Sequence, residues 1–160
     1  MRIAAEYSFN DGLESLRKQK PAEFAEVVDA IKSATVAGKL YSPKDIGKAI
    51  LEYLYEKGWT KPKVELSTPG NLIEGDAVKN GVGLELQFGS YAFIGWDSLR
   101  KMTVLAEKGA YKFGIEIAPM ASLRRRMSKG VGSFEQVTER LEKTGNLDLG
   151  IPVAILGIDV

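Results

Sequence analysis

The fold is decided by residues 72–88, which read LIEGDAVKNGVGLELQF. Two apolar runs, Leu72–Val78 and Val82–Phe88, are separated by Lys79-Asn80-Gly81. Asn-Gly between two such runs is the strongest short-range signal for a β-hairpin, because a type I′ turn needs positive φ at both of its central residues. The stretch therefore predicts two antiparallel strands joined at Asn80 and Gly81.

The expected turn also predicts which side chains face each other. Counting outward from the turn, Asp76 falls opposite Glu85 and shares a face with it, at a Cβ separation of about 4.5–5.5 Å. Gln87 lies two residues beyond Glu85 and projects from the same face, with Glu74 opposite it. The full expected ladder is Lys79 with Val82, Val78 with Gly83, Ala77 with Leu84, and Asp76 with Glu85.

Two facing carboxylates repel each other, so a compensating cation is expected at Asp76 and Glu85. A hard divalent metal ion between them is the economical solution, and the Gln87 amide can orient water or contact a phosphate without adding charge. The alternative is that all three are polar residues on the solvated face of an open hairpin, which is a common arrangement. Aromatic residues downstream would help to cover this face and so favour the metal interpretation: Tyr91, Phe93 and Trp96.

The rest of the chain shows helical and strand patterns without a repeat or linker, so one domain over residues 1–160 is expected. Ser42 can cap a helix that has Pro43 at its first position and Asp45 at the capping-box position, with Gly58 after its end. This order of elements predicts an α/β layer fold with a mixed β-sheet flanked by helices. The other expected elements are a helix over Ala22–Ala37 with Gly38 as its stop, a strand over Lys63–Ser67, a helix from Asp97 to about Glu107, a strand over Phe113–Pro119, a helix over Phe134–Lys143 and a strand over Val153–Ile158.

The composition limits the chemistry that the chain can perform. It contains no histidine and no cysteine, which excludes Ser-His-Asp and Cys-His machinery, disulfides, and metal sites built on these residues. Oxygen ligands remain, and these suit hard cations such as Mg²⁺, Mn²⁺ or Ca²⁺. With 22 Lys and Arg against 21 Asp and Glu, the net charge of +1 neither demands nor forbids a nucleic-acid partner. No apolar run has the length of a membrane span and no signal peptide is evident, so a cytoplasmic location is expected.

Asp76, followed nine residues later by Glu85-Leu86-Gln87, resembles the active-site motif of the BglII/BstYI family of type II restriction endonucleases. This family belongs to the PD-(D/E)xK nuclease superfamily but carries Gln where most members carry Lys. The resemblance runs from end to end of the chain. Further matching segments are Tyr7–Glu14, Leu40–Pro43, Glu56–Trp59, Ile115–Met120, Met127–Gly130 and Pro152–Ile158.

The resemblance implies Mg²⁺-dependent hydrolysis of double-stranded DNA by a homodimer that acts on a short palindrome with a GATC core. Asp76 and Glu85 would ligate the metal, which Mn²⁺ or Ca²⁺ can replace, and the backbone carbonyl of Leu86 would be a further ligand. Gln87 would take the place of the usual lysine. A metal that lowers the pKa of a bound water needs no imidazole base, which agrees with a chain that lacks histidine.

The resemblance also indicates candidate DNA-binding residues. Ser90 stands where relatives carry a longer polar residue that reads the site. The segment Ser128–Phe134 matches a major-groove reading segment, in which Lys129 and Ser133 depart from the family pattern and leave the exact target sequence open. The densest basic run, Arg124-Arg125-Arg126, supplies phosphate contacts through Arg124 and Arg126 in one interpretation and is a solvated helix end in the other.

Several other residues have more than one interpretation. Glu116 lies inside an apolar strand pattern and either joins the acidic cluster or pairs with Lys112 or an arginine. Glu14 is interpreted as an acid at the start of a helix. Trp59 and Trp96 are interpreted as core or interface aromatics.

Three functions are open at this point. The first is the homodimeric, Mg²⁺-dependent restriction endonuclease. The second is a nuclease-fold DNA-binding protein with weak or no cleavage, suggested by the compact chain and the altered DNA-reading positions. The third is a less specific nuclease that acts on DNA structure or damage. Digestion of plasmid DNA separates the three functions. The restriction endonuclease predicts discrete fragments, the DNA-binding protein predicts binding without cuts, and the less specific nuclease predicts a smear of fragments.

Overall fold

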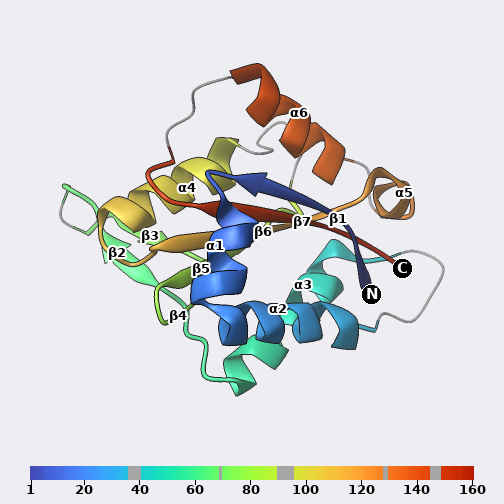
Figure 1. Cartoon of the computed structure of the whole chain (residues 1–160), viewed down its shortest axis with the longest axis horizontal. Coiled ribbons are helices and arrows are strands. Elements are labelled where there is room, and N and C mark those ends of the chain that lie inside the picture. Colours follow the sequence, from blue (N-terminus) through green and yellow to red (C-terminus); the bar gives the residue numbers. More distant parts are fainter. Residues whose placement is uncertain (36–40, 69, 90–95, 128–129, 145–148) are drawn as a thin grey trace.

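The computed structural model describes residues 1–35, 41–68, 70–89, 96–127, 130–144 and 149–160, apart from the side chains of residues 96–98 and 144. A mixed β-sheet forms the centre, and helices cover both of its faces (Figure 1). This arrangement confirms the α/β class that the order of helical and strand patterns predicts.

The main sheet has five strands in the order β1-β7-β6-β5-β4. The central strands β7, β6 and β5 run parallel to one another, whereas β1 and β4 are antiparallel to their neighbours at the two edges. β6 and β7 are buried along nearly their whole length, as expected for parallel strands covered on both faces. The strands are β1 (Arg2–Phe9), β4 (Ala77–Lys79), β5 (Val82–Leu86), β6 (Phe113–Pro119) and β7 (Val153–Asp159).

Two apolar cores lie against the sheet, one on each face. Helices α1, α2 and α3 contribute Leu16, Ile31 and Ile50 to the first core. Helices α4 and α6 contribute Met102 and Val137 to the second, and the two groups of helices lie on opposite sides of the sheet in Figure 1. The helices are α1 (Gly12–Gln19), α2 (Pro21–Ser33), α3 (Pro43–Glu56), α4 (Trp96–Glu107), α5 (Ala121–Arg124) and α6 (Phe134–Thr144).

α3 begins and ends as its sequence predicts. The Ser42 hydroxyl oxygen accepts a hydrogen bond from the backbone N–H of Asp45 at 3.2 Å, and Pro43 occupies the first helical position. Gly58 follows the helix with a φ of 85°, a conformation that glycine adopts without steric cost. The inner face of α3 is buried through Ile46, Gly47, Ile50 and Leu54.

Two other elements are shorter than expected. α2 ends at Ser33 and not at Ala37, because the backbone becomes extended at Ala34 and the next residue, Thr35, is β-branched and so loses side-chain freedom in a helix. The expected stop at Gly38 lies outside the described residues. The strand expected over Lys63–Ser67 is present only over Lys63–Glu65, as β2.

The run Leu72–Val78, expected as a single strand, is divided at Gly75 and Asp76. Its first part is β3 (Leu72–Glu74), which pairs with β2 in a separate two-stranded sheet, and its second part is β4. At the break, the backbone N–H of Gly75 donates to the carbonyl oxygen of Pro62 at 3.1 Å. The chain therefore changes sheet immediately before Asp76.

The sequence patterns do not predict β1 or α5. For α1 they give only Glu14, which lies in the first turn of that helix and so confirms its interpretation as a helix-start acid. In β1 the apolar alternation is weak, because one of its inward positions is the small residue Ala5. A register shift between Ile3 and Ala5 also divides the strand, so that Ile3 packs against the first core while Ala5, Tyr7 and Phe9 pack against the second. Positions 3, 5, 7 and 9 are all apolar, so the period of two is present in the sequence but is weakened by the small Ala5, while the bulge places Ile3 on the other face of the sheet.

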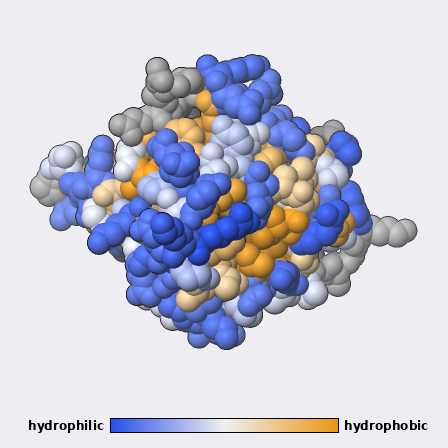
Figure 2. Space-filling model, viewed as in Figure 1, coloured by the Kyte–Doolittle hydropathy of each residue, from blue (hydrophilic) through white to orange (hydrophobic). Residues whose placement is uncertain are grey.

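The surface is mostly hydrophilic. On the face shown in Figure 2, apolar side chains form a limited area among hydrophilic ones. Among the described residues, the exposed large apolar side chains are Tyr55 in α3, Leu72 in β3 and the terminal Val160, and isolated side chains of this kind are normal on a protein surface. No helix in the described part of the chain is both long enough and apolar enough to cross a membrane.

Candidate active site

The hairpin has the predicted turn and register. Asn80 and Gly81 have φ values of 50° and 81°, the positive pair that a type I′ turn requires. The ladder ends at Ala77, so the fourth expected pair, Asp76 with Glu85, is not part of it. The pairs that form are Lys79 with Val82, Val78 with Gly83, and Ala77 with Leu84.

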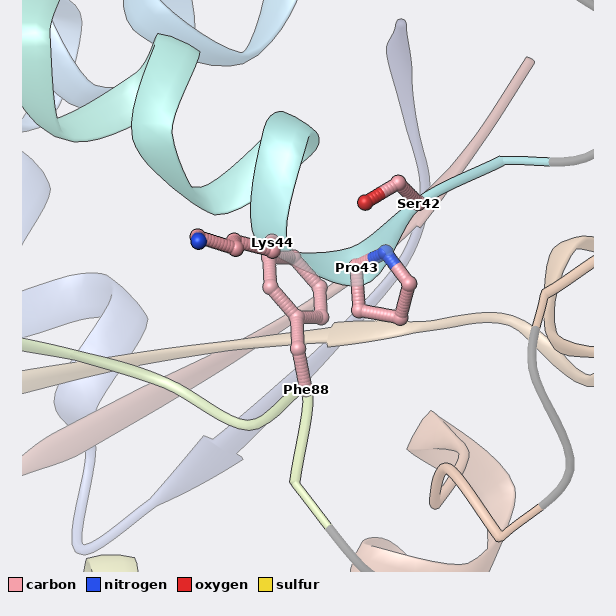
Figure 3. A pocket seen from close by; sticks show the side chains of 4 residues that line it. All are labelled: Ser42, Pro43, Lys44 and Phe88. Carbon is pink, nitrogen blue, oxygen red and sulfur yellow. The ribbon is translucent and has the colours of Figure 1, made fainter.

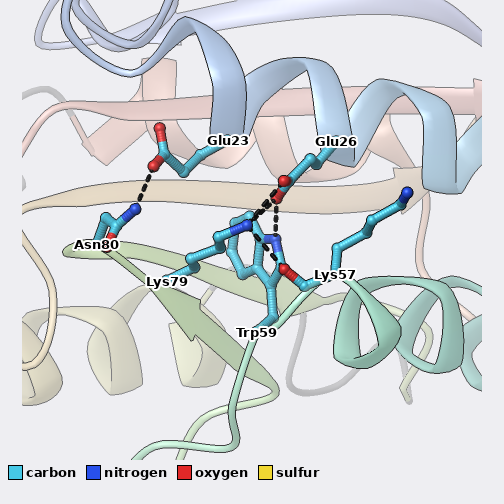
Figure 4. Close-up of polar contacts among 6 residues, drawn as sticks. All are labelled: Glu23, Glu26, Lys57, Trp59, Lys79 and Asn80. Carbon is cyan, nitrogen blue, oxygen red and sulfur yellow. Dashed lines mark hydrogen bonds and ion pairs between the residues drawn. The ribbon is translucent and has the colours of Figure 1, made fainter.

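A polar cluster ties this turn to the helices on the first face of the sheet (Figure 4). Glu26 in α2 accepts hydrogen bonds from the indole N–H of Trp59 at 2.7 Å and from the Nζ of Lys79 at 2.7 and 2.9 Å. The Asn80 amide donates to Glu23 at 2.6 Å, and this contact lowers the pKa of Glu23. Trp59 is 2% exposed and is a core residue, in agreement with one of its two interpretations.

Asp76 leaves the ladder because both its side chain and its backbone have other partners. Its Oδ2 accepts a hydrogen bond from the backbone N–H of Leu86 at 2.8 Å. Its backbone carbonyl oxygen accepts another from the hydroxyl of Tyr55 in α3 at 2.7 Å. These contacts hold the half-buried carboxylate of Asp76 beside the end of β5, next to Glu85.

Glu85 is the buried member of the acidic pair and is only 1% exposed. Burial raises the pKa of Glu85 to about 7, the ammonium group of Lys101 acts in the opposite direction, and the negative charge of Asp76 adds to the rise. Lys101 extends from α4 and forms an ion pair with the Oε2 atom of Glu85. The buried carboxylate therefore has a cation beside it, as burial of a charge requires.

The other oxygen of Glu85 is held by Tyr111, which precedes β6. The Tyr111 hydroxyl donates to Oε1 at 2.9 Å, and burial raises the pKa of Tyr111, so the group stays protonated and acts as a donor. A Cβ atom at Gly83 would come within 2.3 Å of the tyrosine ring, and one at Gly75 within 2.0 Å of its hydroxyl oxygen. Both glycines are needed for Tyr111 to reach Glu85.

Gln87 lies just past β5 and is buried. Its backbone N–H donates to the carbonyl oxygen of Ile117 at 2.8 Å, so the contact between β5 and β6 continues beyond Leu86. Side chains alternate along a strand, so Gln87 projects from the same face as Glu85. A carboxylate and an amide thus follow one another at the C-terminal end of β5.

Glu116 is fully buried in β6, where it is the register partner of Glu85. Lys112, one of the partners considered for it, is an exposed residue before β6. Within the described part of the chain, no group of three or more His, Cys, Asp or Glu side chains is arranged to hold a metal ion. The acidic pair is therefore Asp76 and Glu85, and Glu116 lies beside Glu85 on the neighbouring strand.

Glu74 is not opposite Gln87, contrary to the sequence-based expectation. β3 pairs with β2, and Glu74 faces Lys63 across that small sheet. Its carboxylate forms ion pairs of 2.6 Å with Lys61 and with Lys63, and these contacts lower the pKa of Glu74 to about 2. Glu74 therefore belongs to a surface cluster and not to the acidic pair.

Of the candidate DNA-reading residues, Ser90, Ser128 and Lys129 lie outside the described residues, as do Tyr91 and Phe93. Segments next to them are in contact, because the backbone N–H of Gly132 donates to the carbonyl oxygen of Gly89 at 3.3 Å. Ser133 is buried immediately before α6, and its backbone N–H donates to the side-chain oxygen of Gln136 at 3.1 Å.

The basic run lies at the end of α5, which follows β6. Arg125 and Arg126 are exposed and Arg124 is half-buried. The guanidinium group of Arg126 lies over the ring of Tyr41, 4.5 Å from its centroid, and donates to the tyrosine hydroxyl at 3.2 Å. This end of α5 is therefore connected to the segment that leads into α3.

A hollow of about 470 Å³ opens between the start of α3 and the residue that follows Gln87. Its lining residues are Ser42, Pro43, Lys44 and Phe88 (Figure 3). It lies beside the C-terminal end of β5 and carries a single exposed cation, Lys44, among these lining residues.

Comparison with known proteins identifies the family. The family model described as "Restriction endonuclease BglII/BglIII" matches residues 4–158. The chain belongs to the BglII/BglIII restriction endonuclease family. It is therefore a site-specific deoxyribonuclease of a family that binds DNA and generally uses divalent metal ions.

Solved structures from this family share the fold. BglII in complex with a DNA 16-mer superposes with a TM-score of 0.75 at 18% sequence identity, covering 100% of this chain and 79% of the other. Free BglII gives a TM-score of 0.73 at 19% identity, covering 100% and 80%. Comparison with curated protein sequences gives no match.

Three residues of the acidic site escape the sequence analysis: Tyr55, Lys101 and Tyr111. Each comes from a different element and contacts Asp76 or Glu85 only because the chain folds back on the hairpin. The sequence did contain one signal for Tyr111, the two glycines that make room for it: Gly75 directly precedes Asp76, Gly83 lies two residues before Glu85, and both interrupt strand patterns.

Proposed function

We propose that the chain hydrolyses phosphodiester bonds in double-stranded DNA with Mg²⁺ held by Asp76, Glu85 and the backbone carbonyl of Leu86. The proposal is carried by one observation: a buried carboxylate, Glu85, lies next to a second one and is accompanied by a cation, Lys101. Mg²⁺ suits such a site, because it uses one or two protein carboxylates and completes its shell with waters and substrate phosphates.

The residues around the pair have distinct roles in this proposal. A metal ion bound there supplies a water of lowered pKa and offsets the charge that develops on the phosphate. Asp76 presents a carboxylate whose position is set by the Leu86 N–H and the Tyr55 hydroxyl. Gln87 orients water or phosphate without adding negative charge to a site that already holds two acids.

The proposal extends to how DNA is read. A homodimer would cut a short palindrome with a GATC core, as the resemblance to the family implies. Ser90 and the Ser128–Phe134 segment would read bases together, which is supported by the hydrogen bond between Gly89 and Gly132. Arg124 and Arg126 would contact phosphates and so position the protein without reading sequence. An enzyme that acts on DNA in this way would be located in the cytoplasm.

Plasmid digestion tests this function. Wild-type protein is expected to give discrete fragments with Mg²⁺ and none with EDTA, and sequencing the fragment ends gives the target site. Asp76→Asn is expected to lower the cleavage rate by about 100-fold or more, because even outer partners of a metal site contribute 10–100-fold. Glu74→Gln is the matched control, since this acid is paired with Lys61 and Lys63 on the small two-stranded sheet. Unchanged cleavage by Asp76→Asn contradicts the proposal.

A second candidate function is DNA binding without cleavage. It is the alternative suggested by the compact chain and the altered DNA-reading positions, and it is an outcome of the same digestion rather than a function that the family assignment favours. Gel-shift binding with Mg²⁺ present and intact plasmid would support this candidate.

A further inference from the structure

We infer that Tyr111 and Lys101 are positioning residues that act on Glu85 in opposite senses: Tyr111 orients the carboxylate for a metal ion, and Lys101 holds the cation position until the metal displaces it. The inference rests on the proposed metal-dependent function and deepens it. It concerns two residues that contact opposite oxygens of one buried side chain.

Tyr111 restricts Glu85 to one orientation. Its hydroxyl donates to Oε1 at 2.9 Å, and the residue is 2% exposed, with its ring against Gly83 and its hydroxyl against Gly75, so it has no space to move aside. Oε1 thereby already has a protein partner, whereas Oε2 is the oxygen that faces a cation in the structure. Hydrogen bonds of this kind to metal ligands set their orientation and their basicity.

Lys101 marks where that cation belongs. Its ammonium group lies on Oε2, the oxygen that Tyr111 leaves available, and its side chain is 28% exposed. The flexible four-carbon stem of lysine allows the ammonium group to turn toward solvent. A divalent ion is repelled by an ammonium group at the same oxygen, so metal binding requires Lys101 to leave Glu85.

The two roles predict effects of opposite sign on metal affinity. Tyr111→Phe removes only the hydroxyl, leaves Oε1 buried without its donor, and is expected to weaken Mn²⁺ binding about tenfold or more. Lys101→Met keeps the side-chain length but removes the competitor. Measured at a pH high enough to keep Glu85 ionised without its cation, it is expected to tighten Mn²⁺ binding about fivefold, the size of effect of a partly exposed ion pair. A residue that only supports the fold would weaken binding in both cases.

Titration calorimetry with Mn²⁺ alone, without DNA, measures both effects on the full chain. Two matched controls are available. Tyr7→Phe removes the hydroxyl of another tyrosine packed against the second core, but on β1 at the opposite edge of the sheet. Lys108→Met removes an exposed lysine just after α4. Both controls are expected to bind Mn²⁺ as the wild type does. For a variant of reduced stability, urea unfolding with and without Mn²⁺ compares Mn²⁺ affinities in another way. The gain in the free energy of unfolding on adding Mn²⁺ reports the affinity, because a ligand stabilises the state it binds.

The outcomes separate this inference from the proposed function. Asp76→Asn serves as the reference for the metal site: if it binds Mn²⁺ as well as the wild type, or if the wild type does not bind Mn²⁺, the proposed metal site and this inference both fail. If Asp76→Asn loses binding while Tyr111→Phe leaves the affinity unchanged, or Lys101→Met weakens it, the proposed function stands and the inference is overturned.

Discussion

Glu85→Gln is expected to make the metal-free protein more stable at alkaline pH, although it removes a residue of the proposed site. The pKa of Glu85 is raised from 4.5 to about 7 in the folded protein, chiefly by burial. At 1.36 kcal/mol per pKa unit, ionised Glu85 costs the folded state about 3 kcal/mol relative to the unfolded chain. A neutral amide of the same shape carries no such cost.

The sign of the pH dependence follows from proton binding. The folded state holds the Glu85 proton more tightly than the unfolded state does, so the free energy of unfolding falls as the pH rises from 4.5 to about 7 and is then level for this group. The difference between Glu85→Gln and the wild type should therefore grow by about 2–3 kcal/mol between pH 5 and pH 8.

Urea unfolding in EDTA at several pH values measures this difference. Glu74→Gln provides a control of opposite sign: the pKa of Glu74 is lowered, so its charged form stabilises the folded state by an amount that is constant above pH 4.5. A difference between Glu85→Gln and the wild type that stays constant from pH 5 to pH 8 would refute the link between burial of Glu85 and its ionisation.

Three further changes test the surroundings of the site. Glu26→Gln weakens the charged contacts with Trp59 and Lys79 and should lower the free energy of unfolding by about 1–3 kcal/mol, measured in urea. An unchanged midpoint of urea unfolding would contradict the idea that Glu26 holds the hairpin on α2. Gly81→Val forces a β-branched residue to a φ of 81° and should cost about 1–2 kcal/mol by the same assay, whereas a neutral effect argues against the type I′ turn. Arg126→Ala should weaken DNA binding for all sequences alike and reduce the slope of its salt dependence by about one unit, and a change confined to one sequence would instead indicate base reading.

Local patterns in the sequence account for the centre of the site. Asn80 and Gly81 accept the positive φ that a type I′ turn requires at two successive residues. The turn over residues 79–82 then sets the three pairs of the ladder that form. The same local signal extrapolates wrongly past Ala77, because the partner of Gly75 is Pro62, which comes from another part of the chain. Periodicity describes a strand and carries no information about which sheet the strand joins.

The contacts that hold the carboxylate of Glu85 join residues that are far apart in the sequence. Lys101 and Tyr111 reach Glu85 only after α4 and β6 have packed against β5. Each is unremarkable in its own segment, a lysine in an amphipathic helix and a tyrosine before a strand. Their roles arise from the parallel pairing of β5 with β6, which no local pattern specifies.

The Glu26 cluster also has a spectroscopic consequence. The chain contains two tryptophans, Trp59 and Trp96, and the indole N–H of Trp59 donates to the same carboxylate that holds Lys79 of the hairpin. A Trp96→Phe variant leaves a single indole fluorophore, whose emission depends on that carboxylate and on exclusion of water from a side chain that is 2% exposed. Fluorescence at Trp59 would then report directly whether the β4–β5 hairpin is docked on α2, in the free protein, with metal and on DNA.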